Sequence, residues 1–173
     1  MTELREELHF RSGDGSCAAW LLRPHPVNAM PCPVVVMAHG FTATREDGLL
    51  PYAEQFAREG IATLAFDYRG FGDSTGGEPQ VLNIGRELED LESAVDFARS
   101  LDGIDARRVA LWGSSFGGGL ALDYAARTMS LSCVIAQVPF TDGISSLRSV
   151  PPRTSVRLAV KALADIRSHR ASG

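Results

Sequence analysis

Hydrophobic residues fall into short uninterrupted runs, and the segments between the runs carry apolar residues every three to four positions. A continuous apolar run is typical of a strand buried on both faces, and the wider spacing is typical of an amphipathic helix. Strands are predicted at 34–38, 61–66, 109–112 and 131–138, and helices at 49–59, 86–101, 117–127 and 155–167. Buried strands alternating with helices predict an α/β fold with a doubly wound, mainly parallel sheet.

The start and the end of the chain depart from this alternation. Residues 6–11 and 17–22 flank a glycine-containing turn, which predicts an antiparallel hairpin ahead of the parallel strands. Pro151 and Pro152 then break the chain before its last helix. We therefore expect a core over residues 1–147 and a basic helical tail, the possible start of a cap, over residues 148–173.

Composition and charge exclude several classes of protein. The 173 residues are 45% hydrophobic and 22% charged, which is ordinary for one globular domain and unlike a disordered chain. The net charge of −4 gives no general case for nucleic-acid binding. No apolar stretch approaches the ~20 residues that span a bilayer, and the acidic N-terminus lacks the apolar region of a signal peptide. We expect a cytoplasmic protein.

The tail differs in charge from the rest of the chain. Residues 1–142 carry 11 basic and 20 acidic side chains, whereas residues 143–173 carry six basic and one acidic. A basic amphipathic helix can touch an anionic membrane, but the apolar stripe of the helix at 155–167 is small and has no aromatic residue. We expect no membrane association.

The three cysteines, Cys17, Cys32 and Cys133, are odd in number and show no metal-ligand spacing. We interpret them as small apolar residues that fill space in a reducing compartment. The sequence predicts no metal site and no cofactor.

The most informative motif is Gly113-Ser114-Ser115-Phe116-Gly117, which lies directly between a predicted strand and a predicted helix. A serine on such a turn adopts strained backbone geometry that exposes its hydroxyl at the carboxyl end of the sheet. The residues two before and two after it must be small, which favours Ser115 over Ser114 as a nucleophile. The alternative is a glycine-rich turn that only connects strand to helix.

The segment His39-Gly40-Phe41 closes the first parallel strand and opens on the same sheet edge. A hydrolytic serine needs two backbone donors for its oxyanion, and the N–H groups of Phe41 and Phe116 are placed to supply them. His39 is a candidate general base, but its position at a strand end before glycine favours a histidine that shapes the loop.

The segment 67–74 is also glycine-rich, which raises a nucleotide-binding alternative with Asp90 as the ribose ligand. Its glycines do not follow the dinucleotide spacing, and a proline-containing loop follows in place of a helix. We therefore favour a structural loop.

In this order and spacing, the segments 34–41, 67–74 and 113–117 resemble the α/β-hydrolase superfamily, and the chain from 20 to 147 is most similar to bacterial dienelactone-hydrolase or acetyl-xylan-esterase-like enzymes. The resemblance implies hydrolysis of an ester, thioester or amide of a small-molecule acyl substrate through an acyl-Ser115 intermediate, without a cofactor. The alternative is a catalytically silent binding or interaction module that keeps the turn but lacks acid and base.

The superfamily places its acid after a seventh strand and its histidine after an eighth, and these C-terminal strands are missing from the pattern. Asp142 and His169 satisfy the chain order of serine, acid and histidine. His169 follows a basic helix, however, and a polar terminus holds an imidazole poorly. The simpler interpretation is the N-terminal part of a larger hydrolase, whose exposed last strand self-associates unless the basic helix covers it.

Overall fold

The computed structural model describes residues 5–24, 31–143, 151–157 and 160–161. They belong to two compact units, Met1–Phe140 and Thr141–Gly173, and each unit is described by itself.

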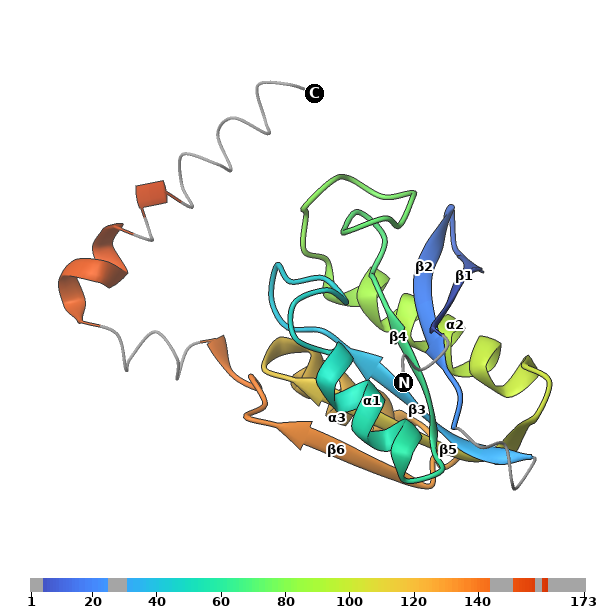
Figure 1. Ribbon diagram of the computed structural model, residues 1–173. Helices are drawn as coiled ribbons and strands as arrows, with labels where there is room; N and C mark the ends of the chain where they lie inside the picture. The colour runs from blue at the N-terminus through green and yellow to red at the C-terminus, as the bar shows by residue number, and fades with distance from the viewer. Residues whose placement is uncertain (1–4, 25–30, 144–150, 158–159, 162–173) are drawn as a thin grey trace. The chain divides into compact units, whose positions relative to one another are not determined.

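The first unit is built on one six-stranded sheet with the strand order β1-β2-β4-β3-β5-β6 (Figure 1). The strands are β1 (Arg5–Ser12), β2 (Gly15–Leu22), β3 (Cys32–Ala38), β4 (Ala62–Phe66), β5 (Ile104–Ser114) and β6 (Cys133–Gln137). β1 and β2 form an antiparallel hairpin, and β2 joins β4 in the antiparallel direction. The remaining pairs are parallel. The predicted fold class, with its N-terminal hairpin, is confirmed.

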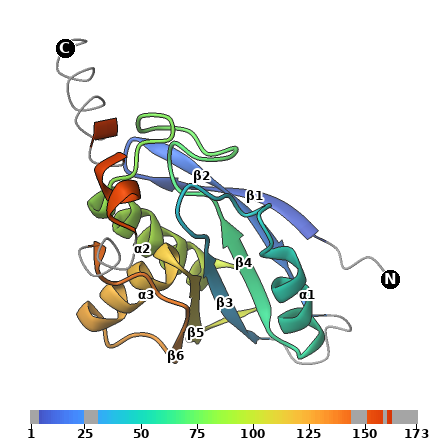
Figure 2. The same cartoon turned by 90° about the vertical axis from the view of Figure 1, so that its left-hand side faces the viewer.

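Three helices cover the two faces of this sheet (Figure 2). They are α1 (Leu50–Arg58), α2 (Ile84–Ser100) and α3 (Phe116–Arg127). The side chains of β3 alternate between two hydrophobic clusters, because successive residues of a strand point to opposite faces. Val34 and Val36 pack in the cluster that contains residues of α2 and α3, whereas Val35 and Met37 pack in the cluster that contains residues of α1.

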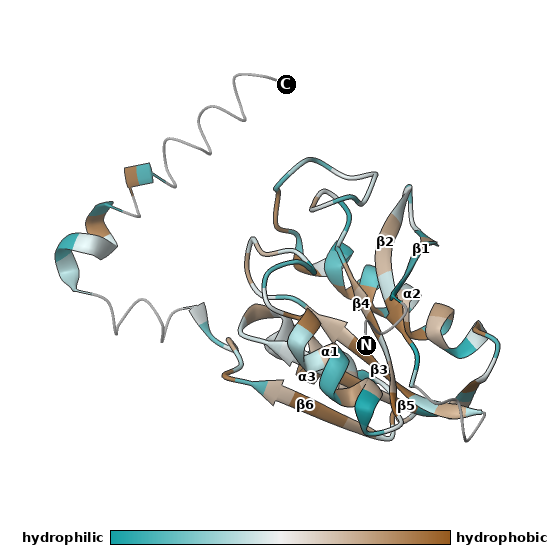
Figure 3. Cartoon of the chain, in the orientation of Figure 1, coloured by the Kyte–Doolittle hydropathy of each residue, from teal (hydrophilic) through white to brown (hydrophobic). Residues whose placement is uncertain are grey.

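The last strand is less buried than the parallel strands β3 and β4. β6 forms one edge of the sheet, and its residues are alternately exposed and half-buried. Ile135 is 41% exposed, and Val138 just beyond the strand is 83% exposed. Figure 3 shows that hydrophobic residues continue into this edge strand. β6 is thus an edge strand, as the sequence led us to expect, because no further strand of the described residues pairs with its outer side.

The cysteines divide in the same way. Cys17 and Cys32 are buried, as expected of apolar filling residues, and burial raises the pKa of the Cys17 thiol. Cys133 lies on β6 and is exposed, so its assignment as a buried filler is wrong.

In the second unit, residues 152–157 and 160–161 are helical, and the rest of the helix predicted at 155–167 lies outside the described residues. Among the helices that the structure describes, none is both long enough and apolar enough to cross a bilayer.

Candidate active site

The turn at Ser115 joins the end of β5 to the start of α3. Ser115 is exposed and has φ 52° and ψ −115°, a region that non-glycine residues rarely adopt. Its N–H donates to Gln137 O at 2.9 Å, and its carbonyl accepts from Phe140 N–H at 2.8 Å. The strained conformation is therefore held by the last residue of β6 and by the segment that follows it.

The two flanking glycines of the motif have no room for a side chain. A Cβ atom on Gly113 would lie 2.3 Å from Gly117 O. A Cβ atom on Gly117 would lie 2.3 Å from His39 O and 2.5 Å from Ala38 O. Because all of these neighbours are backbone atoms, they cannot rotate away as a side chain could. The close approach brings the start of α3 against the end of β3.

This approach places the His39-Gly40-Phe41 segment beside the serine. A Cβ atom on Gly40 would lie only 3.5 Å from Ser115 Cβ. The rings of Phe41 and Phe116 meet edge to face, with 6.1 Å between their centroids. Neither the N–H of Phe41 nor that of Phe116 donates to another backbone group among the described residues. The two residues predicted to supply oxyanion donors therefore contact each other, and each directly follows a residue of the Ser115 turn or of the segment beside it.

His39 is 2% exposed, and both of its ring nitrogens have backbone partners. Nε2 accepts a long hydrogen bond from Tyr68 N–H at 3.4 Å, and Nδ1 lies 3.0 Å from Gly40 O. Burial lowers the pKa of His39 below its ordinary value. These contacts agree with a histidine that shapes the loop and leave it without a nitrogen for proton transfer.

The glycine-rich segment 67–74 is held by a buried ion pair. Asp67 Oδ1 accepts from Arg45 N–H at 2.6 Å, and its other oxygen pairs with the Arg45 guanidinium, which also contacts Asp73. A Cβ atom on Gly72 would lie 2.1 Å from the Asp67 carboxylate. The segment is therefore packed around a carboxylate, as expected of a structural loop.

Asp90, the ribose ligand of the alternative interpretation, is completely buried. Its Oδ1 accepts from Ser12 Oγ and from Arg69 Nε, each at 2.6 Å, and its Oδ2 accepts from Arg69 N–H at 2.9 Å. Both oxygens are occupied inside the protein, so the contacts give nucleotide binding no support.

Asp142 belongs to the second unit, and the structure does not describe its position relative to Ser115. His169 lies outside the described residues. Their assignment as acid and base therefore stays a prediction.

A cavity of about 260 Å³ adjoins the serine turn. Its walls are His39, Gly40, Ala43, Asp47, Gly48, Leu49, Tyr52, Trp112, Ser114 and Gln137. Two of these residues, Gly40 and Ser114, are the chain neighbours of Phe41 and Ser115. Among these lining residues, Gln137 Nε2 donates to Tyr52 Oη at 3.4 Å, and the Tyr52 ring packs on Trp112.

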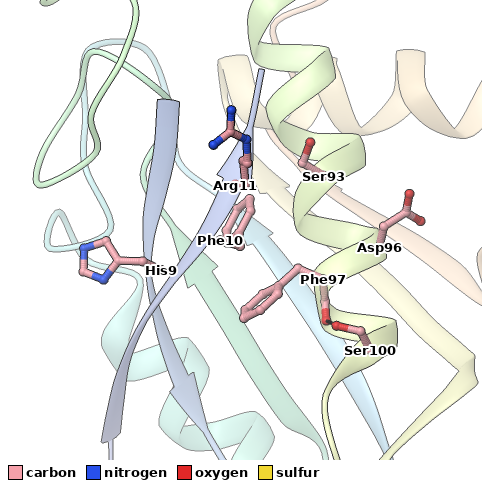
Figure 4. Close-up of a pocket in the computed structure, with 7 residues that line it drawn as sticks. All are labelled: His9, Phe10, Arg11, Ser93, Asp96, Phe97 and Ser100. Atoms are coloured by element: carbon pink, nitrogen blue, oxygen red, sulfur yellow. Dashed lines mark hydrogen bonds between the residues drawn. The ribbon is translucent and has the colours of Figure 1, made fainter. Parts of the chain in front are cut away.

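A second cavity, of about 510 Å³, lies between β1 and α2. Figure 4 shows the rings of Phe10 and Phe97 side by side, with His9 pointing away from them. The centroids of the two phenylalanine rings are 5.1 Å apart. None of the predicted site residues lines this cavity. The Ser115 turn therefore stays the candidate site.

Comparison with protein families supports the assignment of the fold. The profile described as "Serine aminopeptidase, S33" matches residues 29–171. The chain belongs to this family. The match confirms the α/β-hydrolase superfamily predicted from the three motifs, because the solved structures that resemble this S33 family member are α/β hydrolases.

The relatives of this S33 family member carry names that indicate several activities. It is 48% identical over 159 residues to the quorum-quenching protein AidA of Acinetobacter baumannii (strain MDR-ZJ06), covering 92% of this chain and 52% of that protein. It is 35% identical to the thiohydrolase aneE of Aspergillus aculeatus, covering 69% of this chain and 37% of that protein. The α/β hydrolase GrgF from Penicillium sp. sh18 superposes with a TM-score of 0.80 at 25% identity, covering 98% of this chain and 56% of GrgF. The chain thus spans about half the length of these relatives or less.

Sequence reasoning missed the polar residues around the site. Arg45 pairs with Asp67 across 22 positions, and Gln137 meets Tyr52 across 85. No local pattern marks such pairs, because they meet only when the strand order is known. One signal was available. A charged residue directly after a predicted buried strand, such as Asp67, indicates that a partner of opposite charge lies nearby.

Proposed function

We propose that this chain carries the nucleophile and the oxyanion donors of a serine hydrolase that cleaves esters or thioesters of small acyl substrates. The observation that carries the proposal is the conformation of Ser115: an exposed serine at positive φ, between two glycines with no room for a side chain. A turn that only connected strand to helix would not need this strain.

In the proposed reaction, Ser115 Oγ attacks the acyl carbonyl and loses its proton to a base. The carbonyl oxygen becomes an oxyanion that accepts from the N–H groups of Phe41 and Phe116. The bond to the alcohol or thiol then breaks, and the leaving group takes the proton. Water next attacks acyl-Ser115, releasing the carboxylic acid and restoring the serine hydroxyl.

The relatives favour this choice of substrates. One relative is named a thiohydrolase, and solved structures of similar fold include esterases. A thioester and an ester present the same carbonyl to the nucleophile and differ in the leaving group, so one site geometry serves both.

For the acid and the base, Asp142 and His169 keep the chain order of the superfamily. We expect His169→Ala to change the reactivity of Ser115 less than twofold, because the sequence predicts a basic helix, and not a strand end, before His169. A loss of orders of magnitude, as on removal of a triad member, would instead assign His169 as the base.

The test is covalent labelling by an organophosphonate probe, with the modified residue located by mass spectrometry. We expect labelling of the parent at Ser115, loss of labelling in Ser115→Ala, and retention in Ser114→Ala, the matched neighbour. Equal labelling of Ser115→Ala and the parent would overturn the assignment. No labelling of any serine would favour the catalytically silent binding module.

A further inference from the structure

The Gly40–Phe41 peptide is held from its carbonyl side. Gly40 O lies 3.0 Å from His39 Nδ1 and also accepts from Ala43 N–H at 3.2 Å. A peptide unit is planar and trans, so its C=O and N–H point in opposite directions. Fixing Gly40 O on one side therefore fixes the direction of the Phe41 N–H on the other.

The tautomer of His39 follows from its second contact. Tyr68 N–H donates to Nε2, so Nε2 carries no proton, and Nδ1–H is the group that donates to Gly40 O. Tyr68 lies two residues beyond Phe66, the last residue of β4, which pairs with Ala38 in the sheet. The imidazole thus connects a rigid strand end to a loop peptide.

We propose that His39 is the positioning residue for the oxyanion site: through Nδ1–H it orients the Gly40–Phe41 peptide so that the Phe41 N–H faces the substrate oxygen. The role of the Phe41 N–H rests on the function proposed above. A hydrogen bond accepted by the carbonyl also polarises the peptide, which makes its N–H a stronger donor.

The surroundings keep the ring neutral and fixed in place. His39 packs edge to face on Tyr68 and Phe71, with centroids 4.7 Å and 6.1 Å away. The charged groups that face it are Asp67 and Asp47, which oppose the effect of burial, and burial is the larger influence on its pKa. A protonated ring would place Nε2–H against Tyr68 N–H and lose that anchor.

Two substitutions separate positioning from simple structural support. In His39→Asn the side-chain amide reaches the position of Nδ1 and keeps a donor for Gly40 O. In His39→Gln it reaches the position of Nε2 and keeps an acceptor for Tyr68 N–H but no donor for Gly40 O. We expect His39→Gln to slow phosphonate labelling of Ser115 at least tenfold, since loss of one oxyanion donor costs about 10²–10³ in rate, whereas His39→Asn should stay within threefold of the parent. His9→Asn, at an exposed histidine of β1, is the matched control and should change nothing.

The labelling rates are read together with urea unfolding and ¹⁵N NMR of the parent. The NMR spectrum should show a His39 protonated on Nδ1 only, and the Phe41 amide resonance should move in His39→Gln but not in His39→Asn. Equal slowing of both variants in step with lost stability, or a parent His39 protonated on Nε2, would overturn the proposal. If Ser115 of the parent is not labelled at all, the proposed function fails, and the tautomer and the Phe41 amide still decide whether His39 holds the peptide.

Discussion

The turn at Ser115 and the outer edge of β6 are neighbours in the sheet, but the first unit surrounds them to very different degrees. At the turn, Gly113 and Gly117 are enclosed by backbone, and both the N–H and the carbonyl of Ser115 have partners. Along β6, every second residue is exposed. The first unit therefore fixes the geometry of Ser115 by itself, while its described residues leave the apolar side chains of β6 without a cover.

The opposite edge of the sheet makes the difference clearer. β1 is also an edge strand, and its sequence, REELHFRS, is rich in charged residues. Charged side chains on an edge strand prevent pairing with other chains. β6 has the sequence CVIAQ, with no charge and no proline. Charged side chains therefore protect the β1 edge against pairing with other chains, and the β6 edge has no such protection.

The largest effect should come from filling the space at Gly117. We expect Gly117→Ala to lower the free energy of unfolding by at least about 3 kcal/mol, because its Cβ would meet the His39 and Ala38 carbonyl oxygens. Gly60→Ala is the control: Gly60 has φ 83° and open space around it, so it should lose only about 1 kcal/mol. Urea unfolding measures both. Equal losses would mean that the turn is no more tightly enclosed than a surface loop.

A second test addresses a buried carboxyl of the well-packed region. Glu87 is 2% exposed, and burial raises its pKa to about 7. Between the ordinary glutamate value of about 4.3 and this value, the folded protein holds a proton that the unfolded chain has released. Stability should therefore fall as the pH rises from about 4 to about 7, and stay low above it.

Glu87→Gln removes this dependence. We expect the variant to be about 1–3 kcal/mol more stable than the parent at pH 8 and nearly equal to it at pH 4. Urea unfolding at pH 4, 6 and 8 gives the comparison, with the exposed Glu92→Gln on the same helix as control. A parent whose stability rises from pH 4 to pH 8 relative to the variant would contradict the expectation.

The strain at Ser115 should be measurable as a smaller effect. Ser115→Gly relieves the positive φ and should raise the free energy of unfolding by about 1 kcal/mol, while Ser115→Ala, which keeps the strain, should leave it within about 0.5 kcal/mol. Thermal unfolding of the three proteins provides the measurement. If the two variants were equally stable, the turn would hold its conformation without strain.

The smallest effect on stability, but a clear one on association, is expected at β6. We expect the parent to self-associate through this edge, and Ile135→Lys to suppress association while changing the free energy of unfolding by less than about 0.5 kcal/mol. Leu122→Lys is the matched control, because Leu122 and Ile135 are each 41% exposed. Sedimentation over a wide concentration range distinguishes them. A parent that stays monomeric throughout would show that the edge is covered.

The Ser115 turn and the β6 edge also differ in how far the sequence predicted them. The alternation of apolar runs and helical spacing predicted all six strands and the three helices of the first unit, and the glycine spacing selected Ser115 over Ser114. Both are local signals. The place of β6 at a sheet edge was predicted only through the resemblance to the superfamily, because an apolar run has the same sequence whether or not a neighbour covers it. β5 begins at Ile104, whereas the predicted strand begins at Val109. The apolar pattern hid the first part of the strand, because Asp105, Arg107 and Arg108 interrupt it.

The ion-pair network around Arg69 has a consequence for how this protein is made. Its guanidinium contacts Asp14 in the β1–β2 turn and Asp90 in α2, and Ser12 of β1 also donates to Asp90. A ribosome adds about 5–20 residues per second, so the 78 positions between Ser12 and Asp90 take roughly 4 to 16 seconds to synthesise. For most of that interval both strands of the hairpin have been synthesised, but Asp90, their buried partner, does not yet exist. The first two strands must therefore stay soluble without Asp90 during this time, and the charged residues of β1 favour their solubility.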